Sequence, residues 1–142
     1  MTNIKLSYVL RNTKLTECTP IIDNYIYYVK KPVKEKVYNP TGNDYYEIFS
    51  FEFLIITNNG EKQAIILRCD SVDLHWYVFK RWRKKHVLSN ALRTGIISEI
   101  WPENKKITCC YEWDDNRYEK YKMTSHLAEI AGLEMNDKPP MY

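Results

Sequence analysis

Hydrophobic and polar residues alternate most regularly between residues 45 and 69, where the pattern predicts a β-hairpin. Side chains two residues apart lie on the same face of a strand, and the apolar series on one face is Phe49, Phe51, Phe53 and Ile55. The series ends near Asn59-Gly60, a dipeptide that favours a two-residue turn with positive φ at both positions. We therefore expect two antiparallel strands joined by this turn.

The register of this hairpin follows from the length of its turn. If the turn contains two residues, Phe51 faces Arg68 and Leu54 faces Ile65 across the pair. Both faces of the hairpin are largely apolar, which is typical of strands that are covered on both sides. The hairpin is therefore expected to lie in the centre of the sheet.

The N-terminal part of the chain predicts two more strands and a loop. Residues 4–10 and 21–31 are rich in β-branched and aromatic residues and lack helical periodicity, so we expect strands there. Turn-favouring residues follow at three positions in residues 31–44, namely Pro32, Pro40 and Gly42. We expect this segment to be a surface loop.

Residues 71–93 predict a long helix. Apolar side chains fall within one broad helical arc, and they are Val72, Trp76, Phe79, Val87 and Ala91. Asp70 or Ser71 is expected to cap the N-terminus of this helix, and Gly95 to follow its C-terminus.

The C-terminal part predicts a second hairpin and a second helix. Residues 95–101 and 105–113 are expected to form the two strands. Residues 115–131 are amphipathic, with Asp114 or Asp115 as the N-cap and Gly132 at the end. Residues 133–142 are expected to form a disordered tail.

Together these elements predict one α+β domain over residues 1–132. The expected order is ββββαββα, with a mostly antiparallel sheet of about six strands. The two helices, at about 71–93 and 115–131, are expected to pack on one face of the sheet.

Composition supports a folded domain and limits its location. The chain has 142 residues, of which 44% are hydrophobic and 27% are charged, a composition typical of folded proteins. No apolar run approaches the length of a membrane span, so we expect a cytoplasmic protein with reduced cysteines. The abundance of Lys, Ile, Asn and Tyr indicates an AT-rich genome, and we expect a virus or mobile element as the source, with the host cytoplasm as the location.

The residues from position 80 to 85 carry the strongest functional indication. The net charge is only +3, but cations cluster here around one aromatic residue in the order Lys80, Arg81, Trp82, Arg83, Lys84, Lys85. On the expected helix most of these cations face solvent, where they can follow a phosphate backbone while the indole stacks on a base. A solvated helix face is the alternative explanation. Our main hypothesis is a non-enzymatic protein that binds nucleic acid or a nucleoprotein complex.

Tyrosines suggest an alternative function, in which the protein is an inhibitor or adaptor that binds another protein. A viral anti-defence protein is one example of this class. Tyr near Lys is typical of protein-binding surfaces, and the candidate residues are Tyr27, Tyr28, Tyr38 and Tyr45. In this hypothesis the basic residues contact an acidic partner. The alternative is that these rings lie on a covered sheet face.

A metal-dependent nuclease is the third hypothesis. Such an enzyme needs converging carboxylates, and the candidates are Glu47, Glu52, Asp70, Asp73 and Glu112. Glu52 is the most notable because its neighbours are apolar, where an unpaired charge is costly.

No nucleotide-binding glycine motif or zinc-ligand spacing is present. Cys109 and Cys110 are neighbours on a predicted strand and should diverge, so no metal or cofactor is expected.

Overall fold

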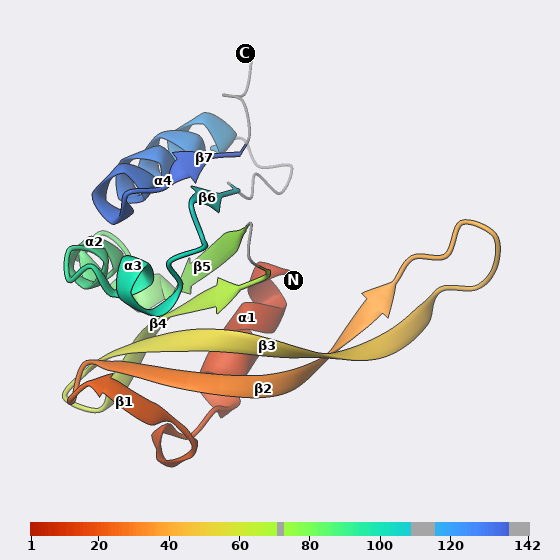
Figure 1. Cartoon of the computed structure of the whole chain (residues 1–142), viewed down its shortest axis with the longest axis horizontal. Helices are drawn as coiled ribbons and strands as arrows, with labels where there is room; N and C mark the ends of the chain where they lie inside the picture. Colours follow the sequence, from red (N-terminus) through yellow and green to blue (C-terminus); the bar gives the residue numbers. More distant parts are fainter. Residues whose placement is uncertain (71–72, 109–115, 137–142) are drawn as a thin grey trace.

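The protein is a single α+β domain, which confirms the expected fold class. The computed structural model describes residues 1–70, 73–108 and 116–136. Its main layer is a five-stranded antiparallel sheet, and a separate two-stranded sheet lies near the last helix (Figure 1).

The main sheet has its strands in chain order from one edge to the other. They are β1 (Thr19–Ile22), β2 (Ile26–Val37), β3 (Tyr45–Asn58), β4 (Glu61–Arg68) and β5 (Leu74–Val78). Every neighbouring pair in this sheet is antiparallel. β5 is therefore an edge strand, and its outer edge becomes important for the candidate site.

The central hairpin, β3 with β4, forms as the sequence predicts. Asn58 pairs with Glu61, and the two turn residues have φ values of 51° and 81°, as a type I′ turn requires. Apolar residues are buried on both faces of the hairpin. The prediction of a central hairpin covered on both sides is thus confirmed.

The predicted register of this hairpin is wrong by one residue because β4 contains a bulge. Ile56 pairs with Ala64, whereas Thr57 pairs with Lys62, so Gln63 is the extra residue. A bulge inserts one residue into one strand and shifts all later pairs. As a result Glu52, and not Phe51, lies opposite Arg68.

Helices cover both faces of the sheet, which corrects the expectation of a single covered face. α1 (Asn3–Asn12) packs against one face, where its apolar partners include Phe53 and Ile65. Three helices contribute to the core of the opposite face, namely α2 (Val87–Leu92), α3 (Ile96–Ile100) and α4 (Arg117–Ala131). The sheet is therefore the middle layer between α1 and the later helices (Figure 1).

The strand predicted at residues 4–10 is instead part of α1. Leu6, Val9 and Leu10 are all buried, and their spacing of three and four residues places them on one helical face. The Thr2 hydroxyl caps the helix by accepting a hydrogen bond from the Lys5 backbone N–H at 3.2 Å. A single buried stripe and a good cap therefore outweigh the β-propensity of this segment.

The helix predicted at residues 71–93 is also wrong in its first half, where β5 lies. Leu74, Trp76 and Val78 join the core on the α2 face, whereas Tyr77 and Phe79 join the core on the α1 face. This alternation has the period of a strand. After β5 come a 3-10 turn, η2 (Lys80–Trp82), and then the short helix α2.

The segment at residues 31–44 is mostly strand and only partly loop. β2 continues through Pro32 to Val37 and pairs with β3 along its whole length. Residues 34–48 of this hairpin are called the arm below. Its base contacts α1, where Lys5 forms an ion pair with Glu35 at 3.9 Å, and its tip extends beyond the rest of the sheet (Figure 1). The loop is thus limited to the tip between Val37 and Tyr45.

The C-terminal part agrees with the prediction in its last helix and in a short strand, Lys106–Ile107, inside the strand expected at residues 105–113. α4 begins at Arg117 and is followed by Gly132, with φ of 75°. The strand expected at residues 95–101 is replaced by α3. Residues 133–136, expected in the tail, include β7 (Glu134–Met135), which pairs in parallel with β6 (Lys106–Ile107). The expected caps Asp114 and Asp115, and residues 137–142, lie outside the described residues.

Candidate nucleic-acid interface

The six residues of the cationic cluster lie on the 3-10 turn η2 and the loop that follows it, not on the predicted α-helix. This basic loop, residues 80–86, runs from η2 to the start of α2. Lys84 and His86 have φ values of 62° and 61°. Non-glycine residues in this left-handed region are uncommon, and strained residues of this kind often occur at functional sites. The basic loop therefore has a specific, strained backbone.

Trp82 is held between charged groups at one side of the basic loop. The guanidinium carbon of Arg81 lies 4.9 Å from the centre of the indole, and Lys85 Nζ lies 6.0 Å from it. Arg81 also forms an ion pair with Glu61 at 3.0 Å. These contacts hold the half-buried indole in place while leaving Lys85 exposed.

Arg83 is oriented by β5 and points to the other side of the basic loop. Its Nε donates a hydrogen bond to the Val78 carbonyl at 3.1 Å, and its guanidinium carbon lies 5.4 Å from the centre of the Tyr77 ring. Lys80 and Lys84 are exposed nearby. The loop thus presents cations in two directions.

On the side of Arg83 and Lys84, the basic loop borders a groove along the outer edge of β5. This cationic groove has a volume of about 850 Å³ and is lined by parts of α1, β5, the basic loop and α4. Its basic lining residues, apart from His75, are Arg11, Arg83, Lys84 and Lys120. Among the described residues that line it, there is no Asp or Glu.

Sequence reasoning identified only part of this groove. Arg83 and Lys84 belong to the predicted cluster, but Arg11 and Lys120 were missed. These two residues are far from the cluster in the chain and come from helices on opposite faces of the sheet. No local pattern marks them, because the fold alone brings them to the groove.

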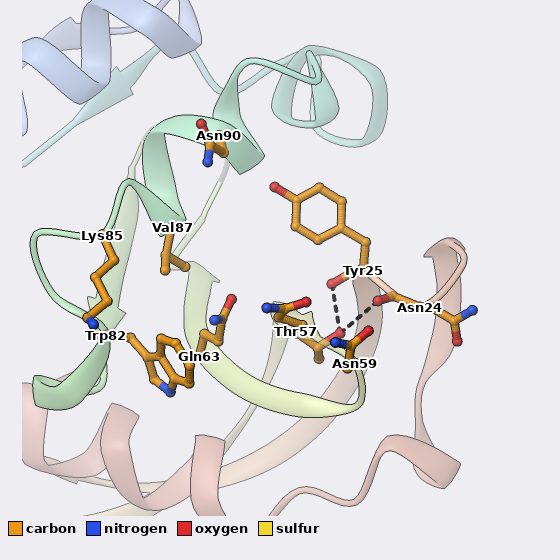
Figure 2. A pocket seen from close by; sticks show the side chains of 10 residues that line it. Asn24, Tyr25, Thr57, Asn59, Gln63, Trp82, Lys85, Val87 and Asn90 are labelled. Carbon is orange, nitrogen blue, oxygen red and sulfur yellow. Dashed lines mark hydrogen bonds between the residues drawn. The ribbon is translucent and has the colours of Figure 1, made fainter.

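On the side of Trp82 and Lys85, the basic loop borders a pocket rich in side-chain amides. This amide pocket has a volume of about 440 Å³, and Trp82 and Lys85 line it together with residues from the ends of several strands (Figure 2). The basic loop therefore separates the cationic groove from the amide pocket and contributes residues to both.

No protein-family model matches this sequence, and no curated protein or solved structure is significantly similar to it. Among the described residues, none of the helices is long and apolar enough to cross a membrane. The function proposed below therefore depends on the groove, the basic loop and the pocket.

The four candidate protein-binding tyrosines do not form one surface. Tyr38 and Tyr45 are exposed on the arm, with 76% and 47% of their surface accessible. Tyr27 and Tyr28 are half-buried in the sheet. Burial, together with a 2.7 Å hydrogen bond from its hydroxyl to Glu52, raises the pKa of Tyr28 to about 12. Only the arm tyrosines are therefore fully available to a partner.

Glu52, the main nuclease candidate, is part of a polar network in the sheet. Its carboxylate accepts hydrogen bonds from Tyr28 and from Arg68 Nη1, each at 2.7 Å. Burial is the largest single influence and would raise the pKa of Glu52, but the hydrogen bonds from Tyr28 and Arg68, together with the positive charge of Arg68, lower it below its ordinary value. The observed register of β3 and β4 places Glu52 opposite Arg68 and so allows this contact, whereas the predicted register placed Phe51 there.

Metal-ligating groups do not converge in the described part of the chain. No group of three His, Cys, Asp or Glu residues there has the arrangement of a metal site. Cys18 and Cys69 are not in disulfides, and burial raises the pKa of the Cys69 thiol to about 11. Glu112, Cys109 and Cys110 lie outside the described residues.

Proposed function

We propose that this protein binds single-stranded nucleic acid in the cationic groove and along the basic loop. The observation that carries the proposal is the groove itself. It gathers four Arg and Lys residues from three separate parts of the chain, and its described lining contains no carboxylate. A phosphate backbone requires this kind of continuous positive surface.

The position of the groove at a sheet edge also favours a polyanion. Within the described residues, no strand pairs with the outer edge of β5, so no sixth strand blocks this edge. Trp76 and Tyr77 line the same groove and provide rings of the kind on which bases stack. Cations and aromatic rings thus occur together at this edge.

A single strand fits this geometry better than a duplex. Duplex readers insert a helix or a two-stranded ribbon into the major groove, which is about 12 Å wide. Here the cations line a groove bounded by α1 and α4, and the adjoining helix α2 has only six residues, of which four are buried. The elements around the cations therefore enclose a strand more readily than they enter a duplex.

The proposal is tested by changing Lys80, Lys84 and Lys85 to Ala together. Binding to a labelled single-stranded oligonucleotide should weaken, and the log–log salt dependence should flatten by about 0.7 for each lost phosphate contact. The matched control changes Lys14, Lys30 and Lys105 to Ala, since these residues are exposed and lie outside both the groove and the basic loop. The control should bind like the parent protein.

Equal affinity and salt dependence in both triple variants would overturn the proposal. An acidic peptide of the same length serves as a second ligand. If it binds as tightly as the oligonucleotide, the basic residues serve an acidic protein partner instead.

The arm supports a second candidate function, binding of a protein partner. Large apolar side chains are exposed along it, and these are Tyr38, Tyr45, Tyr46 and Ile48. Exposed aromatic residues of this kind are enriched at protein interfaces. Capture of a partner from host extract should persist after nuclease treatment and be lost on Tyr38→Ala with Tyr46→Ala. Loss of capture on nuclease treatment would contradict this function.

A further inference from the structure

The amide pocket lies on the other side of the basic loop from the cationic groove. Tyr25 and Asn24 reach it from the turn between β1 and β2, and Gln63 reaches it from the bulge in β4. Asn90 comes from α2 (Figure 2). Its volume of about 440 Å³ is within the range of about 300–1,000 Å³ that is usual for small-molecule sites.

The polar lining of the pocket is unusually uniform. Five of the ten described lining residues carry a side-chain amide, and they are Asn24, Asn58, Asn59, Gln63 and Asn90. The Asn24 amide points away from the other lining side chains (Figure 2). Among the described lining residues, Lys85 is the single cation and there is no carboxylate. Such a lining offers many neutral donors and acceptors, so it suits a neutral polar ligand that carries a negative group at one end.

Gln63 contributes an amide that is available to a ligand. Only 6% of its surface is exposed, and among the described residues its side-chain amide has no hydrogen-bond partner. Its amide oxygen and nitrogen are not among the described buried atoms that lack a partner, so they reach solvent in the pocket. They can therefore hydrogen-bond a ligand without breaking a bond inside the protein.

The β4 bulge aims Gln63 into the pocket. Lys62 lies on the α1 side, where Nζ donates hydrogen bonds to the carbonyls of Arg11 and Thr13. Ala64 belongs to the core on the α2 face. Because the bulge breaks the strict alternation between these two positions, Gln63 lies on the same face as Ala64 and lines the pocket.

The opposite wall is also fixed before any ligand binds. The hydroxyl of Thr57 donates to the carbonyls of Tyr25 and Asn24, at 3.2 and 3.3 Å, and the Thr57 backbone N–H donates to Tyr25 at 2.8 Å (Figure 2). These bonds tie the β1–β2 turn to the end of β3. Trp82 is held on the loop side by Arg81 and Lys85. A pocket with fixed walls loses little entropy on binding.

We propose that the amide pocket binds one unpaired nucleobase of the strand whose backbone lies in the cationic groove. This inference rests on the proposed function. Gln63 and Asn90 hydrogen-bond the edge of the base, because a side-chain amide supplies a donor and an acceptor side by side, as the edge of adenine does. Trp82 and Tyr25 pack against the base, and Lys85 binds the adjacent phosphate.

The test compares two single-stranded oligonucleotides of equal length. One has abasic sites throughout, and the other has a single adenine among abasic sites. The parent protein should bind both, with the adenine oligonucleotide about tenfold tighter, a gain within the range reported for one stacked base. Gln63→Met, which keeps the side-chain length but removes the amide, should bind the two oligonucleotides equally. Its salt dependence should not change, because no phosphate contact is lost.

Asn90→Ala provides a second variant, since this residue is exposed on α2 and its loss does not affect the core. It should also reduce the preference for the adenine oligonucleotide. If the parent protein binds neither oligonucleotide, the proposed function itself fails. If it binds both oligonucleotides equally, or if the preference for adenine survives in both variants, the proposed base binding by the amide pocket is contradicted. The proposed binding of the strand in the cationic groove is then unaffected.

Discussion

Glu52 gives the clearest stability prediction at the scale of single residues. Its carboxylate is only one-quarter exposed and is paired with Arg68. Glu52→Gln should lower the free energy of unfolding by about 1–3 kcal/mol at pH 7, because hydrogen bonds to charged groups are worth this much. Urea denaturation measures the difference. Glu47→Gln, at an exposed position on the same strand, should have almost no effect.

The stabilisation by Glu52 should also depend on pH. Its pKa is lower in the folded protein than the ordinary value of 4.5, so the carboxylate stabilises the fold above the unfolded pKa. This stabilisation is lost as the pH falls through the folded pKa. The stability difference between the parent protein and Glu52→Gln should therefore narrow as the pH falls below the ordinary pKa of 4.5. A constant difference would show that charge is not involved.

Backbone strain in the basic loop gives a second residue-scale prediction. Lys84→Gly and His86→Gly should each raise the melting temperature slightly, because glycine adopts positive φ without the cost of about 1 kcal/mol that other residues incur. Only Lys84→Gly removes a groove lysine. It alone should weaken oligonucleotide binding in a fluorescence anisotropy titration. Equal weakening by His86→Gly would mean that the strained loop shape, and not the charge, binds the strand.

At the scale of elements, the sequence predicted what was locally encoded. The Asn59-Gly60 turn and the helix at residues 115–131 form because their own residues favour them. The segment of β5 was misassigned because Trp76 and Phe79 fit a helical spacing as well as an alternating one. In the folded protein this segment pairs with the edge of β4 and therefore forms a strand. The local sequence does not show that this edge is available for pairing.

The same limit explains the errors in register and in the candidate site. The bulge at Gln63 is one extra residue with no turn signal in the sequence, so the hairpin was aligned by turn length alone. The basic loop was identified from composition, although it was placed on the wrong element. The amide pocket was missed entirely, because its lining comes from five separate segments of the chain.

The turn between β3 and β4 provides a prediction about an element. Gly60 has φ of 81°, so Gly60→Ala should cost about 1–2 kcal/mol of stability, since a Cβ disfavours this conformation. Gly42→Ala is the matched control in the arm. Its added Cβ meets only the end of the Asn39 side chain, at 3.0 Å, and its φ is not positive. Thermal melts should separate the two variants, and similar losses would contradict the assigned turn.

At the scale of the whole molecule, two candidate surfaces belong to different parts of the sheet. The cationic groove follows β5 at one edge, whereas the arm extends from β2 and β3 (Figure 1). The net charge of +3 is small, so its distribution matters more than its total. The two proposed activities, nucleic-acid binding and protein binding, should therefore respond to separate substitutions.

Exposed arm substitutions should leave the nucleic-acid site intact. Tyr38→Ser combined with Ile48→Ser changes two side chains that are 76% and 70% exposed, so the melting temperature should change by only a few degrees. Oligonucleotide affinity should equal that of the parent protein. A large loss of affinity would mean that the arm also contacts the strand.

If the amide pocket binds a base as proposed, the bulge in β4 makes position 63 a place where the protein can change its ligand without changing its fold. The extra residue has no partner in the β3–β4 register, and its side-chain amide contributes no described hydrogen bond to the domain. Neighbouring Ile65 and Ile66 are fully buried in the two cores, and polar substitutions there should abolish folding. In a mutational scan read out by folded yield, position 63 should therefore accept many side chains while these neighbours accept few. New ligand preferences can arise by single substitutions at this position, and the scaffold beneath it can remain unchanged.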